Sequence, residues 1–143
     1  QRIYGLVRPL ADLLFSQFKF HWGERMPDLL IPVPLHRRRL HQREFDQAVA
    51  LARHVSQQIN IPLRENLLIR HRHTASQVGL SAVQRRRNVR RAFQLREPQA
   101  CQGRSLLLID DVYTTGATIG ECARLLQQAG ADWVGVYTLA RVG

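Results

Sequence analysis

The segment that most restricts the fold is residues 105–129, where a strand pattern, two acids, a turn of small residues and a helix pattern follow one another. SLLLI (105–109) has the length and composition of a buried strand. Residues 118–129 follow a helical pattern, and Gly130 stands where glycine commonly ends a helix. A buried strand that leads through a short turn into a helix is the repeating unit of α/β folds. We therefore expect an α/β fold.

The other hydrophobic patterns predict strands and helices in alternation. Pro32 and Pro34 exclude a helix and favour a rigid exit from a short strand. The expected strands are 26–35, 66–70, 92–95 and 133–140, and the expected helices are 3–20 and 46–59, with Asp46 as the cap of the second. Residues 71–91 are polar with weak periodicity, which predicts a mobile excursion with one or two turns of helix. These features predict a mainly parallel sheet flanked by helices, within a single domain spanning residues 1–143.

Two adjacent carboxylates, Asp110 and Asp111, follow the strand 105–109. Open α/β sheets bind ligands beyond the carboxyl ends of their strands, so the acids are expected in such a crevice. The turn 114–118 (TTGAT) then opens a helix, and Gly116 allows the backbone to approach a ligand closely. Backbone amides and the dipole at a helix start attract anions. Carboxylates for hydroxyl groups beside a turn for phosphate predict a sugar-phosphate ligand.

Three other interpretations of LLLIDD fit less well. A nucleotide hydrolase would place a GxxxxGK[ST] loop upstream of such a strand, and the sequence contains none. A response-regulator pocket would use paired acids but not a TTGAT phosphate turn. A purely structural strand and helix cap would not require both Asp110 and Asp111.

Arginine dominates the charge of the chain, which carries 21 basic and 11 acidic side chains and a net charge of +10. Lys19 is the one lysine, and nine arginines lie in two clusters, HRRRLHQR (36–43) and RRRNVRR (85–91). Arginine binds phosphate through two parallel hydrogen bonds. The clusters therefore indicate a phosphate-rich ligand, either a small polyphosphate or a nucleic-acid backbone. A GC-rich genome is the alternative explanation for the bias toward arginine, and a solvated helix face is the alternative for the second cluster.

Several classes of protein and site are disfavoured. The apolar runs fall short of the ~18 residues of a membrane span, and the N-terminus lacks a signal-peptide pattern. Cys101 and Cys122 form no CxxC motif and are expected to be reduced, buried thiols of a cytoplasmic protein. Four histidines lie among arginines, where contact with solvent or phosphate is favoured over metal binding. These are His36, His41, His71 and His73.

The motifs resemble those of a known family. LLLIDDVYTTGAT (106–118) is similar to the 5-phosphoribosyl-1-pyrophosphate (PRPP) motif of type I phosphoribosyltransferases. IPVPLHRRRLHQREFDQAVALA (31–52) resembles the segment "PVPLHRRR…RGFNQ…LA" of the ComF/GntX family, the competence-protein branch of this fold. RHRHTASQVGLSAVQRRRNVRRAF (70–93) resembles that family's "R…T..Q..L…R..N…AF". The resemblance covers roughly residues 3–142 and implies a type I phosphoribosyltransferase fold with a flexible loop over the site.

The resemblance also implies roles for individual residues. Asp110 and Asp111 would bind the ribose 2- and 3-hydroxyls, directly or through Mg²⁺. The 5-phosphate would be held by Thr114, Thr115, Gly116, Ala117 and Thr118. The pyrophosphate loop would comprise Pro34, Leu35, His36, Arg37, Arg38 and Arg39. The flexible loop would span residues 74–87 and contribute Thr74, Gln77 and Arg85, the last two making contacts on closure. The scheme requires no protein nucleophile.

Two functions remain open at this point. One is an enzyme that transfers phosphoribose from PRPP to an acceptor that the sequence does not identify. The other is a non-catalytic sensor of PRPP or nucleotides, or a DNA-processing adaptor whose arginine clusters bind single-stranded DNA or a protein partner. The family is linked to competence, DNA uptake and use of external DNA. REFDQ (43–47) departs from the family's RGFNQ, because Glu44 places a carboxylate beside the expected pyrophosphate site. The family's N-terminal zinc ribbon is not found in this sequence.

Overall fold

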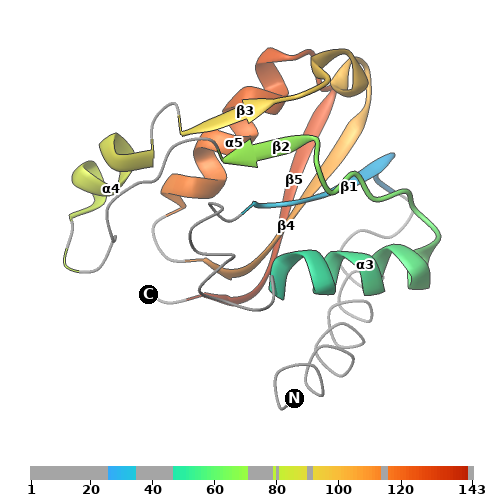
Figure 1. Ribbon diagram of the computed structural model, residues 1–143, viewed down its shortest axis with the longest axis horizontal. Helices are drawn as coiled ribbons and strands as arrows, with labels where there is room; N and C mark the ends of the chain where they lie inside the picture. Colours follow the sequence, from blue (N-terminus) through green and yellow to red (C-terminus); the bar gives the residue numbers. More distant parts are fainter. Residues whose placement is uncertain are drawn as a thin grey trace.

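The computed structural model describes residues 26–34, 47–70, 79, 81–89, 92–113 and 116–141 (Figure 1). Its strands and helices alternate along the chain. In order they are β1 (Leu29–Pro32), α3 (Gln47–Ile59), β2 (Leu68–Arg70), α4 (Ala82–Val89), β3 (Phe93–Leu95), the 3₁₀ helix η1 (Pro98–Cys101), β4 (Ser105–Tyr113), α5 (Ala117–Gln128) and β5 (Trp133–Arg141).

A parallel sheet with the strand order β1-β4-β5 forms the centre of the fold. β1 pairs with β4 from Leu29↔Leu106 to Pro32↔Ile109, and β4 pairs with β5 as far as Tyr113↔Arg141. Leu63 forms a parallel bridge with Leu30, so the segment after α3 runs along the other edge of β1. The predicted α/β fold with a mainly parallel sheet is confirmed.

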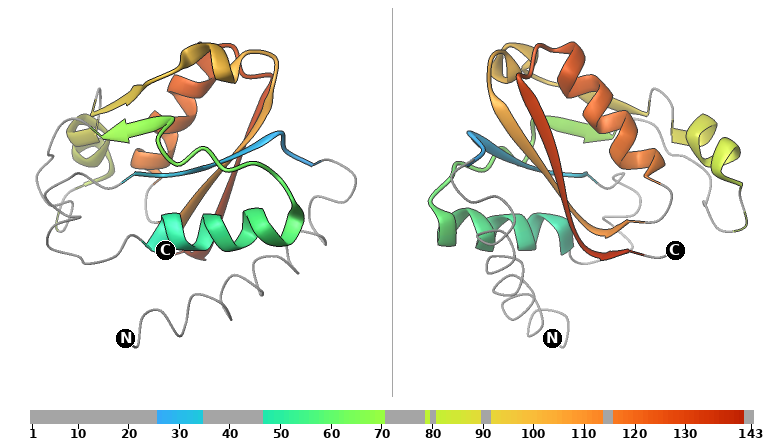
Figure 2. Two further views of the ribbon diagram at one scale, coloured as in Figure 1. Left: turned by 45° about the vertical axis from the view of Figure 1, so that its right-hand side comes forward. Right: turned by 180° about the vertical axis from the view of Figure 1, so that it is seen from behind.

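Helices cover both faces of this sheet, and the side chains of β4 alternate between them. Leu106 and Leu108 face a core shared with α5, η1 and the β2–β3 pair. Leu107 and Ile109 face a second core formed with α3. Figure 2 shows α3 and α5 on opposite sides of the sheet. All four side chains are fully buried, as a strand covered on both faces requires.

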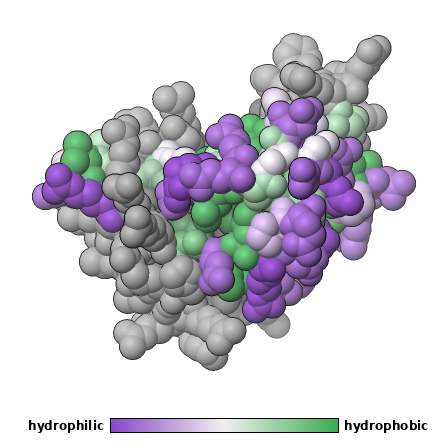
Figure 3. Space-filling model, turned by 90° about the horizontal axis from the view of Figure 1, so that it is seen from above, coloured by the Kyte–Doolittle hydropathy of each residue, from purple (hydrophilic) through white to green (hydrophobic). Residues whose placement is uncertain are grey.

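β2 and β3 form a separate antiparallel pair, which packs on the α5 side through Leu68 and Phe93. Seen from the side on which β3 and η1 lie (Figure 3), hydrophilic side chains border a smaller hydrophobic area. Between the two strands in sequence, α4 stands apart from the sheet and contacts α5 (Figure 1). A capping box begins α4, because Gln84 N–H donates to Ser81 Oγ at 3.2 Å while Ser81 N–H donates to Gln84 Oε1 at 2.9 Å.

Most predicted elements within the described residues are confirmed within a few positions. The eight residues of α4 agree with the one or two helical turns expected in 71–91. The Glu97–Pro98 region begins the 3₁₀ helix η1. The helix predicted at 3–20 and the Asp46 cap lie outside the described residues.

One boundary was wrong in a way that affects the site. The strand predicted at 105–109 continues to Tyr113, so Asp110 and Asp111 lie inside β4 and not after it. The extension follows from tertiary pairing, because β5 continues alongside β4 to Arg141. A hydrogen-bonding partner extends a strand beyond the apolar residues that identify it in the sequence.

Both cysteines are reduced and fully buried, as expected. Burial raises the pKa of the Cys101 thiol, an effect that the nearby charges of Arg104 and Arg64 oppose. Burial also raises the pKa of the Cys122 thiol. Among the described residues, no helix is long and apolar enough to cross a membrane.

Two glycines, one inside α5 and one just beyond its C-terminal end, are expected to respond oppositely to the same substitution. Gly130 has φ +95° and ends the helix in a Schellman motif, in which Ala131 N–H donates to the Leu126 carbonyl at 3.2 Å. Gly130→Ala should lower the free energy of unfolding by about 1 kcal/mol. Gly120, the matched control, lies inside the helix with nothing within 4 Å of an added Cβ. Gly120→Ala should raise that free energy by about 0.5 kcal/mol. Urea denaturation measures both, and equal effects would contradict the assignment of Gly130.

The two thiols are expected to resist modification in the folded protein. The thiolate is the reactive form, so burial and a raised pKa slow the reaction. At pH 8 the native chain should react with a disulfide reagent such as DTNB only as fast as it opens, whereas unfolded chains should titrate two thiols. Rapid labelling of native Cys122 would contradict its burial between α5 and the sheet.

Candidate functional site

A crevice is expected where β1 and β4 part. The last paired residues are Pro32 and Ile109, and Val33 N–H donates to the Ile109 carbonyl at 2.9 Å. Pro34, the last described residue of this segment, follows directly. From Asp110 onward, β4 therefore pairs with β5 and is no longer paired with β1.

The connections of the two strands identify this edge as a topological switch point. β1 leads through α3 to residues 62–64 on its outer side, where Leu30 N–H donates to the Pro62 carbonyl at 2.9 Å. β4 leads in the opposite direction through α5 to β5. Ligands of open α/β sheets bind where the strand order reverses in this way.

Asp110 is the first residue of β4 beyond the end of the β1 ladder, and it is half-buried. The alternation of the strand places it on the face of Leu106 and Leu108, toward α5. Its electrostatic effect supports this placement. Burial is the largest cause of the raised pKa of Cys122 on α5, the Asp110 carboxylate raises this pKa further, and Arg70 on β2 opposes the rise. The Asp110 carboxylate and the Arg70 guanidinium thus both lie close enough to Cys122 to act on its thiol.

Gly116 turns the chain into α5. It adopts φ +77°, a left-handed conformation that favours glycine, and its carbonyl accepts the first helical bond from Gly120 N–H at 2.7 Å. Ala117 and Thr118, expected in the phosphate turn, form the first residues of the helix. Amides of the first turn point out of the amino end of a helix and attract anions. This end of α5 follows β4 at the same edge of the sheet as Pro34.

The structure thus brings part of the predicted site together. Pro34, Asp110, Gly116, Ala117 and Thr118 lie at or beside the carboxyl edge of β1 and β4. Asp111 and Arg85 are described through their backbones, in β4 and α4 respectively. The remaining predicted residues lie outside the described part of the chain: Leu35, His36, Arg37, Arg38, Arg39, Thr74, Gln77, Thr114 and Thr115.

Sequence reasoning missed two buried charged side chains near Asp110. Arg70 ends β2, and Glu121 lies on α5, where it accepts from Arg124 Nη2 at 2.6 Å and Nε at 2.9 Å. The hydrogen bonds to Glu121 raise the pKa of Arg124. No sequence signal marked Arg70, because Leu67, Leu68 and Ile69 are all apolar and show no alternation; the structure places Arg70 on the buried face of Leu68. Glu121 and Arg124 have the i,i+3 spacing of helical ion pairs.

Known proteins resemble this chain in sequence and fold. Residues 46–143 match the family described as "Phosphoribosyl transferase domain". Competence protein F of Haemophilus influenzae is 39% identical over 145 residues, covering 99% of this chain and 63% of that protein. DNA utilization protein YhgH of Escherichia coli O157:H7 is 42% identical over 119 residues, covering 83% and 52%. The chain thus spans about half to two thirds of the length of these relatives.

The fold is also found in solved structures. Adenine phosphoribosyltransferase from Leishmania donovani superposes with a TM-score of 0.59 at 16% identity, covering 95% of this chain and 52% of that one. At this level of identity the likeness concerns the fold alone, and it confirms the type I phosphoribosyltransferase architecture. The similarity to competence protein F and YhgH confirms the resemblance that the motifs indicated. The chain belongs to the phosphoribosyl transferase domain family and is a homologue of competence protein F.

Proposed function

We propose that the protein binds PRPP, or a related phosphoribosyl ligand, with Mg²⁺ in the crevice between β1 and β4. The observation that carries this proposal is the position of Asp110 beyond the β1 ladder, at the edge where Gly116 opens α5. Asp110 and its neighbour Asp111 accept hydrogen bonds from the ribose hydroxyls. The turn 114–118 receives the 5-phosphate, and residues 34–39 receive the pyrophosphate.

The available donor set suits Mg²⁺ in this role. Mg²⁺ prefers oxygen ligands, retains several waters and commonly binds one or two carboxylates together with ligand phosphates. Within the described residues, no three His, Cys, Asp or Glu side chains gather into a metal cage. A half-buried Asp110 at the ligand crevice therefore fits an ion held mainly by water and phosphate oxygens. When bound, Mg²⁺ would neutralise charge on the pyrophosphate.

The reaction that this site would support is displacement of pyrophosphate from the ribosyl carbon by an acceptor. Such a displacement develops positive charge on the sugar and negative charge on the leaving group, so carboxylates and arginines stabilise it without a protein nucleophile. If the site binds PRPP but no acceptor, the protein acts as a sensor of PRPP. The names of the relatives, competence protein F and DNA utilization protein, support a role of this chain in the use of external DNA.

Binding of PRPP with Mg²⁺ is expected to raise the melting temperature, because a ligand specific for the folded state adds about 2.7 kcal/mol of stability at 100 times its Kd. Asp110→Asn should weaken PRPP binding at least about tenfold, the effect of one lost charge-assisted hydrogen bond or more. Asp132→Asn is the matched control, since this exposed acid precedes β5 at the opposite edge of the sheet. Thermal shift and calorimetry measure both variants.

Two results would change the assignment. No stabilisation of the native chain by PRPP with Mg²⁺ contradicts the proposed ligand, and equal losses in Asp110→Asn and Asp132→Asn contradict the proposed location. If PRPP binds but no nucleobase or amine causes pyrophosphate release, the protein is a sensor or an adaptor and not a transferase.

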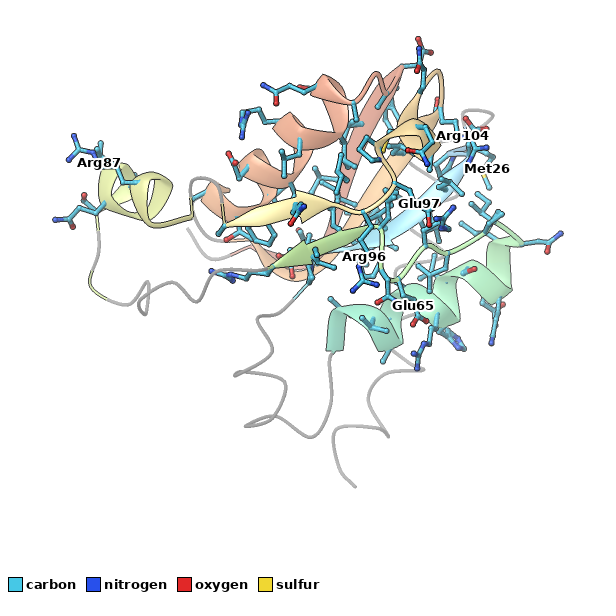
Figure 4. All side chains as sticks on the ribbon, turned by 45° about the horizontal axis from the view of Figure 1, so that its top comes forward. Met26, Glu65, Arg87, Arg96, Glu97 and Arg104 are labelled. Carbon is cyan, nitrogen blue, oxygen red and sulfur yellow. The ribbon has the colours of Figure 1, made fainter. Side chains whose placement is uncertain are left out.

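A second candidate function is binding of single-stranded DNA through α4. Arg87 is exposed, and its side chain points away from the rest of the molecule (Figure 4). Arg85 and Arg86 precede it in the same helix. Val83 is also exposed, with 57% of its surface accessible. An arginine-rich helix that projects into solvent is suited to contact phosphates of a separate macromolecule.

Single-stranded DNA affinity is expected to fall with salt, and the double change Arg86→Ala with Arg87→Ala should make the log–log slope shallower by about 1.4, or ~0.7 per phosphate contact. The control pair is Arg96→Ala with Arg104→Ala, two exposed arginines far from Arg87 (Figure 4). Fluorescence anisotropy at several salt concentrations measures the slopes. Equal changes in both pairs would indicate attraction by net charge and would exclude α4 as the binding element.

A further inference from the structure

Arg70 is a charged side chain that is almost fully buried. It is the last residue of β2, and 8% of its surface is exposed. It shares its face of the strand with Leu68, which packs in the core between the sheet and α5. Removing a guanidinium from water is unfavourable unless another charge or polar group compensates it. The groups around Arg70 therefore indicate which opposite charge compensates its guanidinium.

An aromatic ring fixes the guanidinium. The Cζ atom of Arg70 lies 5.2 Å from the centroid of the Phe93 ring, within cation–π distance. Phe93 is the pairing partner of Arg70 across β2 and β3, and its side chain is buried. Arg70 and Phe93 lie at the two ends of the connection 71–92. The position of the cation is therefore set by the strand pair itself.

Two carboxylates act on the same buried thiol as this cation. Arg70 and Asp110 act in opposite directions on the pKa of Cys122, so both charges are close to one buried thiol. On β4, Asp110 continues the face of Leu106 and Leu108, which share a core with Leu68. Glu121 also acts on Cys122, but both of its oxygens accept from Arg124. Arg124, which lies on the same helix, thus compensates the charge of Glu121.

We propose that Arg70 is the counter-cation of Asp110, held by the Phe93 ring so that the carboxylate is correctly placed at the ligand crevice. Arg70 is then a positioning residue and acts on the ligand through Asp110. Its importance for binding rests on the proposed function, in which Asp110 contacts the phosphoribosyl ligand. The pairing also links the β2–β3 strand pair to the acid that binds the sugar.

A double-mutant cycle without any ligand tests the pairing. Urea denaturation of Arg70→Met, Asp110→Asn and the double variant should give a coupling of roughly fivefold or more in the unfolding equilibrium constant, because each single change leaves the other charge without its partner. Arg70→Met with Glu121→Gln should be additive, as should Arg96→Met with Asp110→Asn. If Arg70→Met does not fold, Arg70→Gln replaces it in the same cycle.

Additivity of Arg70 and Asp110, or stronger coupling of Arg70 to Glu121, would overturn the pairing. Calorimetry with PRPP and Mg²⁺ then tests its consequence. Arg70→Met should weaken binding about tenfold or more, Arg70→Lys should recover part of the loss because it restores the charge, and Arg96→Met should bind as the native chain does. If the native chain does not bind PRPP, the proposed function fails, whereas the ligand-free cycle still decides whether Arg70 and Asp110 are paired.

Discussion

The rest of this structure depends on how β4 is paired. Its first half pairs with both β1 and β5, and its second half pairs, among the described residues, with β5 alone. Up to Ile109 the strand lies between β1 and β5, and helices cover both of its faces. From Asp110 onward β1 is no longer paired with it. The same strand therefore supplies the centre of both cores and the acid of the crevice.

The register of this strand is strongly determined. Four consecutive side chains, Leu106 to Ile109, are fully buried, and each contributes about 1.5 to 3 kcal/mol by leaving water. A slip of one residue would exchange the two faces and move Asp110 away from α5. Hydrophobic packing thus positions the carboxylate, although the carboxylate contributes no packing itself. This explains how two acids can follow directly on an apolar run without weakening the fold.

The charged side chains fall into two physically different groups. Arg53 with Glu65 and Arg64 with Glu97 are partly or largely exposed pairs, and such pairs contribute at most about 1 kcal/mol each. Arg70 and Glu121 are buried near Asp110, where the desolvation of a charge costs several kcal/mol. A concentration of buried charge on one side of α5 is poorly explained by stability, whereas the proposed charged ligand would account for it.

Local pattern was sufficient for much of the fold and for the composition of the candidate site. Strand and helix identities followed from periodicity, and the end of α5 followed from Gly130, because these features depend on neighbours in the chain. The acids and the TTGAT turn were recognisable as a unit for the same reason. The extension of β4 to Tyr113 depends on pairing with β5. The burial of Arg70 depends on its contact with Phe93, which lies on another strand. The amino-acid order alone therefore determined which groups are present and which local elements carry them. Tertiary structure decided where β1 leaves β4 and which charges meet beside Asp110, since those outcomes depend on pairing between strands that no local pattern encodes.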